Sequence, residues 1–216
     1  MIYDCQDADV REAALDAALY SLKRGGVVVL PTDTVYGIGA DAFDPHAVAR
    51  LLTTKGRGRQ MPPPVLIAES AVMDALATEI SEPARALAEA FWPGPLTLIL
   101  PAQPQLTWDL GETRGTVALR VPDDELSRDL LRRTGPLAVS SANRSGLPPA
   151  VSAMEAEEYF GFAVPVYLDG GSRTTLEPST IVDACVAPLT VVRSGAVPLE
   201  RLREVVPDIE DGPAAP

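Results

Sequence analysis

Short apolar runs recur along the chain and predict strands. Residues 27–30 are wholly apolar and mostly β-branched, and they lie between Gly25-Gly26 and Pro31. A run of this kind, bounded by turn-forming residues, is typical of a strand buried on both faces of a sheet. Similar runs predict strands over residues 65–67, 96–100, 116–121, 137–140, 164–168, 180–182 and 189–192.

Between these runs, apolar residues recur at helical spacing. Over residues 9–23 they fall on one side of a helix, with Asp9 and Glu12 as the expected capping pair and Gly25 as the stop. Because strands and helices do not alternate strictly, the order predicts a mixed α/β sheet with helices packed on it. The other expected helices cover residues 45–53, 71–77, 81–91, 124–133, 152–160 and 198–206, with Ser81 and Ser152 as caps of two of them.

The organisation of the chain favours one domain. A length of 216 residues suits a single core, and the sequence shows neither an internal repeat nor a dividing linker. We therefore expect one domain over residues 1–206. Residues 207–216 form an acidic tail rich in proline and alanine, which we expect to be disordered.

Composition narrows the class of protein. Hydrophobic residues make up 46% and charged residues 22% of the chain, which are values of a globular protein. No apolar run approaches the roughly 20 residues of a membrane span, and the N-terminus lacks the features of a signal peptide, so we expect a cytoplasmic protein that binds no membrane. The net charge of −12 counts against non-specific nucleic-acid binding and makes clusters of basic residues more informative.

Cysteine and histidine usage argues against a metal site. Cys5 and Cys185 are far apart and belong to no CxxC motif, so we expect both to be packing residues. His46 is the only histidine, which excludes a histidine-rich metal site. It follows Asp44-Pro45 at the start of an expected helix and is predicted to lie at the surface.

Polar residues follow or precede several of the expected strands. The segment 32–36 contains two threonines, an aspartate and a tyrosine, the segment 140–146 contains three serines and an asparagine, and Ser179-Thr180 opens a further strand. Such loops can orient a small polar ligand at a sheet. They can equally be ordinary turns whose side chains bond to the local backbone.

Basic residues lie between these polar segments. Lys and Arg side chains bind phosphate as point charges and bidentate donors, so their gathering in an acidic protein suggests a nucleotide site. The sequence has no P-loop and no complete dinucleotide fingerprint. A solvated charge run and a surface-paired strand arginine are the alternatives. The residues concerned are Lys55, Arg57, Arg59, Arg120 and Arg193.

Six segments occur in the order seen in one known family. They are PTDTVYG at 31–37, KGR at 55–57, WPGPLT at 92–97, ALRVP at 118–122, SANRSG at 141–146 and STIVD at 179–183. On these motifs the chain resembles the YrdC-like threonylcarbamoyl-AMP synthases, in the short form without an extra C-terminal domain. The resemblance extends from Val10 to Val206.

The resemblance implies a fold and a reaction. The fold is an open, twisted α/β sheet with a concave basic surface. The activity is that of a nucleotidyltransferase that joins L-threonine, bicarbonate and ATP into threonylcarbamoyl-AMP and diphosphate, for N6-threonylcarbamoyladenosine at position 37 of tRNA. Mg²⁺ is expected to arrive with the ATP phosphates, since the sequence offers no carboxylate cage. The expected downstream partners are a threonylcarbamoyl transferase machinery and, indirectly, tRNA.

The resemblance also assigns site residues by position. Lys55 and Arg57 are the expected catalytic residues, because placed cations stabilise charge on phosphoryl oxygens. The residues expected to bind ATP are Lys55, Arg57, Thr116, Ser141, Asn143 and Arg193. Those expected to bind threonine are Thr34, Tyr36, Arg120, Ser179 and Thr180.

The sequence departs from the family pattern at two places, and two other functions are alternatives to the synthase. Residues 62–64 are three prolines, which should stiffen their loop and weaken strand pairing, and Leu66 stands where some relatives have histidine. One alternative is a paralogue that acts on another carbamoyl or acyl acceptor, since a fold does not fix the substrate. The other is an RNA-binding module, against which the net charge of −12 weighs.

Overall fold

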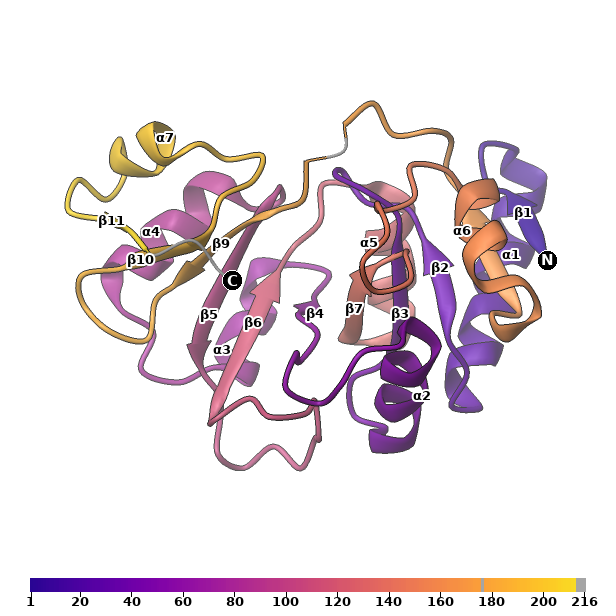
Figure 1. Cartoon of the computed structure of the whole chain (residues 1–216), viewed down its shortest axis with the longest axis horizontal. Helices are drawn as coiled ribbons and strands as arrows, with labels where there is room; N and C mark the ends of the chain where they lie inside the picture. Colours follow the sequence, from indigo (N-terminus) through magenta and orange to yellow (C-terminus); the bar gives the residue numbers. More distant parts are fainter. Residues whose placement is uncertain (176, 213–216) are drawn as a thin grey trace.

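A single mixed sheet runs through the molecule (Figure 1). The computed structural model describes residues 1–175 and 177–212, and within these the strand order is β1-β8-β2-β3-β7-β4-β6-β5-β9-β10-β11. The strands are β1 (Ile2–Asp4), β2 (Val28–Leu30), β3 (Gly37–Asp41), β4 (Val65–Leu66), β5 (Leu96–Pro101), β6 (Thr116–Arg120), β7 (Leu137–Ser141), β8 (Val166–Asp169), β9 (Thr180–Asp183), β10 (Thr190–Arg193) and β11 (Glu210–Asp211).

Along the chain, helices alternate with groups of these strands, and each helix lies close to a segment where the sequence predicts one. They are α1 (Ala8–Lys23), α2 (Pro45–Lys55), α3 (Met73–Leu76), α4 (Glu82–Phe91), α5 (Glu125–Thr134), α6 (Ala153–Phe160) and α7 (Leu199–Arg203), with single 3₁₀ turns at Ser70–Val72 and Gly161–Ala163. The chain therefore has the predicted α/β fold, an open, twisted mixed sheet with flanking helices.

Helix caps follow the sequence in two cases and depart from it in one. Ser81 accepts a hydrogen bond from Ala84 N and Ser152 from Glu155 N, as expected. The cap of α1 is Asp7, which accepts from the backbone N–H of Asp9, so the expected capping pair was wrong. The first turn of α1 carries few apolar residues, and apolar spacing therefore placed the start of the helix too late.

The strand over residues 28–30 is buried on both faces, as predicted. Val27 and Val29 belong to one hydrophobic cluster, while Val28 and Leu30 belong to another. Because successive strand residues point to opposite faces, the two clusters lie on opposite sides of the sheet. Buried residues of α2, α3, α4, α6 and α7 join the larger cluster, and among the described helices only α1 and α5 join the smaller one.

Three strands are absent from the sequence prediction, namely β1, β3 and β11. In β3, Gly37 and Gly39 lie against Val139 of β7, and a Cβ at Gly37 would be 2.6 Å from Val139 Cγ1. Glycine is needed for this close approach. Because glycine has a low β propensity, the sequence of this segment does not predict a strand.

Part of the segment expected to be disordered packs on the sheet instead. Ile209 is buried, and β11 pairs with β10 in parallel. The reason is that one apolar residue, Ile209, packs with the larger cluster and draws the acidic chain to the sheet edge. Residues 213–216 lie outside the described residues. No described helix is long and apolar enough to cross a membrane.

Candidate active site

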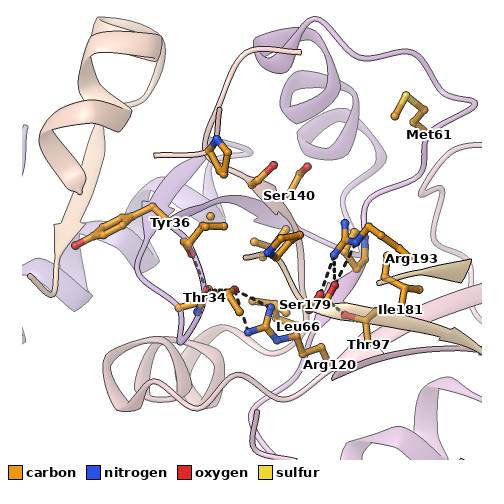
Figure 2. A pocket seen from close by; sticks show the side chains of 18 of the residues that line it. Thr34, Tyr36, Met61, Leu66, Thr97, Arg120, Ser140, Ser179, Ile181 and Arg193 are labelled. Carbon is orange, nitrogen blue, oxygen red and sulfur yellow. Dashed lines mark hydrogen bonds between the residues drawn. The ribbon is translucent and has the colours of Figure 1, made fainter. Parts of the chain in front are cut away.

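A cavity of about 510 Å³ opens on the less covered face of the sheet (Figure 2). Leu66 and Val139 line it and also belong to the smaller cluster, so the cavity lies on the same face as α1 and α5. Its remaining walls come from the loops 32–37 and 57–64 and from residues in or beside β5, β6, β7, β9 and β10. Seven of the residues expected to bind ATP or threonine line it: Thr34, Tyr36, Arg57, Arg120, Ser141, Ser179 and Arg193.

Three guanidinium groups converge on this cavity. Arg57 and Arg193 form no ion pair with any carboxylate in residues 1–175 and 177–212. Burial lowers the pKa of Arg57, and partial burial followed by the charges of Arg120 and Arg57 lowers the pKa of Arg193. Placing like charges this close without a counterion is unfavourable, which makes the cavity a site for an anion.

Arg120 is held firmly by the protein. Its side chain is 7% exposed, and NH2 lies 2.6 Å from Asp33 Oδ1 while Nε donates to Gly94 O at 3.0 Å. Both NH1 and NH2 donate to Thr34 Oγ1 at 3.2 Å. Burial lowers the pKa of Arg120, and the Asp33 carboxylate opposes that effect. A bound carboxylate would share this guanidinium with Asp33, since NH1 keeps one N–H group for it.

Two hydroxyls and one arginine form a second set of donors. Ser179 Oγ lies 2.8 Å from Thr97 Oγ1 and accepts from Arg193 NH2 at 3.0 Å. The carbonyl oxygen of Ser179 also accepts from Arg193, from NH2 at 2.6 Å and from Nε at 3.2 Å. When Thr97 donates to Ser179, the Ser179 proton is free to point at a ligand in the cavity.

Lys55 lies behind the cavity and supports one of its loops. Its ammonium group donates to Ser141 O, to Asn143 O at 2.8 Å and to Asn143 Oδ1 at 3.1 Å, and the residue is 1% exposed. Ser141 Oγ donates to the same Asn143 Oδ1 at 2.6 Å. All three ammonium protons are thus used within the protein. Arg57, by contrast, faces the cavity and donates from NH1 to Ser140 Oγ at 3.0 Å.

Three other expected ligand residues use their hydroxyls elsewhere. Tyr36 OH lies 3.0 Å from Asp169 Oδ1 and 2.8 Å from Gly171 O, and Figure 2 shows it directed away from the arginines. Thr180 is fully buried and donates to Val197 O at 2.7 Å. Thr116 donates to Thr113 O and lines a separate cavity of about 150 Å³.

The sequence matches a described protein family over most of its length. The model of the Sua5, YciO and YrdC proteins, described as "Telomere recombination", covers residues 20–195. The chain belongs to the Sua5/YciO/YrdC family. The family resemblance drawn from the six sequence motifs is therefore confirmed.

Individual members of the Sua5/YciO/YrdC family show which proteins this chain is similar to. A protein of Mycobacterium tuberculosis named "Putative threonylcarbamoyl-AMP synthase" is 48% identical over 204 residues, which are 94% of each chain. The crystal structure of P. abyssi Sua5 complexed with L-threonine has a TM-score of 0.88 at 37% identity, and the match covers 92% of this chain and 59% of that one. E. coli YciO, with a TM-score of 0.80 at 22% identity, shares the fold.

The side chains that line the cavity are poor ligands for a protein-bound Mg²⁺ ion. Among the described residues, no group of three or more His, Cys, Asp or Glu side chains could hold a metal. Asp33, beside Arg120, is already paired with it, and the cavity itself is lined by guanidinium and hydroxyl groups. An ion that prefers oxygen anions would therefore be held by ligand phosphates.

Several residues of the site were missed at the level of the sequence. Thr97 and Ser140 line the cavity, and Asp33 anchors Arg120. Asp33 and Ser140 belong to the polar segments 32–36 and 140–146, but the sequence does not show that they bond to Arg120 and Arg57. Thr97 stands inside an apolar strand run and gave one signal, its place in the WPGPLT motif.

The stability of this Sua5/YciO/YrdC domain should depend on Lys55 near neutral pH. Burial, followed by the charge of Arg57, lowers the pKa of Lys55 from 10.5 to about 7. Between these two values the unfolded chain binds more protons, so the free energy of unfolding should rise with pH, by about 1–2 kcal/mol from pH 7 to pH 8.5. Urea unfolding should show this rise in the wild type and not in Lys55→Met. A rise of equal size in Lys55→Met would assign it to another group.

Proposed function

We propose that this protein is a threonylcarbamoyl-AMP synthase, which forms L-threonylcarbamoyladenylate and diphosphate from L-threonine, bicarbonate and ATP. The observation that carries the proposal is the pair Arg57 and Arg193, two cations that face one cavity and have no carboxylate partner among the described residues, in a protein of net charge −12. A relative 48% identical over 94% of each chain bears the name of this enzyme, and P. abyssi Sua5 binds L-threonine in its crystal structure.

The chemistry needs cations more than covalent groups. Threonine's amine attacks bicarbonate, and loss of water leaves a carbamate. An oxygen of this carbamate attacks the α-phosphate of ATP while diphosphate leaves. Negative charge builds on the phosphoryl oxygens in the transition state, and fixed guanidinium groups stabilise it without reorganisation. We assign this role to Arg57, as the catalytic residue, and to Arg193. Lys55, the second expected catalytic residue, is proposed to act by holding the loop 141–143, because its ammonium protons bond to the protein.

The threonine end of the cavity is the Arg120 side. Arg120 keeps one N–H group for the threonine carboxylate, and Thr34 and Ser179 present hydroxyls beside it. We assign Tyr36 and Thr180 to the support of this end, because their hydroxyls bond to the protein. The carbamate is labile in water, so exclusion of solvent should matter as much as a general base.

The nucleotide end lies by the loop 140–143. Lys55 holds this loop by donating to Ser141 and Asn143, and Arg57 NH1 bonds to Ser140. We propose Ser141, Arg57 and Arg193 as the ATP-binding residues that line the cavity. Of the other expected ATP ligands, Lys55 and Asn143 are proposed to support the loop, and Thr116 lines the smaller cavity. Mg²⁺ supplies charge neutralisation when it is bound with the ATP phosphates. A downstream threonylcarbamoyl transferase, tRNA as the final acceptor and a cytoplasmic location stay predictions.

Diphosphate release tests the proposed function. The assay contains ATP and bicarbonate and compares L-threonine with L-serine, glycine and no amino acid, and the adenylate is identified by its mass. We expect release that depends on threonine and a product with the mass of threonylcarbamoyl-AMP. ATP binding without threonine-dependent release would favour a paralogue with another acceptor. Retention of RNA that weakens steeply as salt rises would favour an RNA-binding module instead.

A further inference from the structure

Two loops meet beside the cavity through contacts that the proposed reaction does not use. The first is residues 56–64, which carry Arg57, and the second is residues 102–115. Arg59 NH2 lies 2.7 Å from Asp109 Oδ1, and the backbone oxygen of Arg59 accepts from Glu112 N at 2.8 Å. We call the contacts of Arg59 with Asp109, Gly111 and Glu112 the clasp.

Gly111 makes the close approach of the clasp possible. Its φ is +108°, and a Cβ at this position would lie 2.6 Å from the backbone oxygen of Arg59. Asp109 Oδ1 also accepts from Gly111 N at 3.1 Å, which fixes the turn that faces Arg59. Only glycine meets both demands without displacing the first loop.

The second loop is anchored on its other side and can serve as a support. The rings of Trp108 and Phe43 stack with centroids 5.4 Å apart and an interplanar angle of 25°. Phe43 lies between β3 and α2, outside both loops. The clasp therefore ties the loop of Arg57 to a segment that is fixed to the rest of the fold.

Arg57 depends on such a support more than the other two arginines of the cavity. Arg120 has an ion pair with Asp33, and Arg193 has three bonds to Ser179. Within residues 1–175 and 177–212, the guanidinium group of Arg57 has one hydrogen bond, to Ser140, and its buried Nε has no partner. Its position is thus set mainly by the backbone of its own loop.

The two loops that the clasp joins also line the smaller cavity. That cavity, of about 150 Å³, lies between Pro62–Pro64 of the first loop and Leu110 and Thr113 of the second. Pro62 and Pro64 line the main cavity as well. Opening the clasp would therefore change the shape of both cavities at the side where Arg57 enters.

We propose that Arg59 and Gly111 are positioning residues, which act through the clasp to hold Arg57 in the geometry that binds the diphosphate part of the ligand. This inference rests on the proposed function for the identity of the ligand. It assigns a role to an exposed ion pair, which by itself would be worth little to stability.

The test compares two glycines of the second loop. Gly111→Ala introduces a Cβ against Arg59 O, whereas Gly115→Ala introduces one at a φ of +80° with no atom within 4 Å. Binding of inorganic diphosphate, measured by calorimetry without threonine, should weaken about tenfold or more in Gly111→Ala and less than about twofold in Gly115→Ala. In threonine-dependent turnover, kcat should fall in Gly111→Ala while the KM for threonine stays the same.

Exchanging the charges of Arg59 and Asp109 gives a second test, which leaves the glycines unchanged. Arg59→Asp should weaken diphosphate binding, and the double variant Arg59→Asp with Asp109→Arg should recover most of it at the wild-type net charge. Equal diphosphate binding in Gly111→Ala and Gly115→Ala, or no recovery in the double variant, would overturn the inference. If diphosphate binding changes as expected in these variants but turnover does not depend on threonine, the proposed function is wrong and the positioning role of the clasp is supported.

Discussion

Replacing Arg57 by alanine is expected to lower threonine-dependent turnover by about 10²-fold or more, because the change removes a fixed cation from the charge that builds on phosphoryl oxygens. Arg57 faces the cavity without a carboxylate partner among the described residues, and only Ser140 Oγ accepts a bond from it. Its removal leaves no unpaired buried carboxylate, so the free energy of unfolding should change little. Diphosphate release by the purified variant measures the first effect and urea unfolding the second.

The matched control for this prediction is Arg85→Ala. Arg85 is also an arginine, but it lies exposed on α4 and pairs with Asp74 outside the cavity. Its loss should leave turnover within about twofold of the wild type, since exposed ion pairs contribute little. Arg57→Lys should recover part of the activity, because a lysine restores the charge without the guanidinium geometry. Unchanged turnover in folded Arg57→Ala would remove this residue from the mechanism.

Replacing Arg120 by alanine should have two effects, one on binding and one on stability. Loss of the free N–H group should raise the KM for threonine while the KM for ATP changes little. Loss of the partner leaves Asp33, whose side chain is 13% exposed, as a poorly solvated charge. Breaking a buried pair in this way costs about 3–5 kcal/mol, so the free energy of unfolding should fall by several kcal/mol.

A double variant separates these two effects. In Arg120→Ala with Asp33→Ala the carboxylate that Arg120 neutralises is removed as well, so most of the lost stability should return while the high KM for threonine persists. Stability is measured by urea unfolding, and KM by diphosphate release at varied threonine. Recovery of the threonine KM in the double variant would show that Arg120 acts only by neutralising Asp33. An effect of Arg120→Ala on ATP alone would place it on the other substrate.

Much of the fold was predictable because the strongest local signals agree with the tertiary structure. The run 27–30 is apolar and β-branched, and it forms a strand whose neighbouring side chains enter two different clusters. His46 is exposed in the first turn of α2, as expected. Where packing rather than propensity decides, as in the glycine-containing strand β3, the sequence carries no strand signal.

Part of the cavity's lining was predictable, but the hydrogen-bond partners of its side chains were not. The motifs identify Thr34, Arg120 and Ser179, and the structure brings all three to one cavity. The direction of a side chain, however, depends on acceptors that are distant in sequence. Lys55 points to carbonyl oxygens of the loop 141–143, and the Tyr36 hydroxyl points to Asp169. No local pattern reveals such partners.

The strand order has a consequence for the protein during its own synthesis. The cavity takes Arg57 from the first third of the chain and Arg120 from the middle. Ser179 comes from just before β9 and Arg193 from the end of β10, and β9 pairs with the much earlier β5. A nascent chain on the ribosome therefore lacks the anion site until β10 has left the exit tunnel. Partly made chains would lack the proposed activity, and the edge of β5 stays unpaired until β9 has been made.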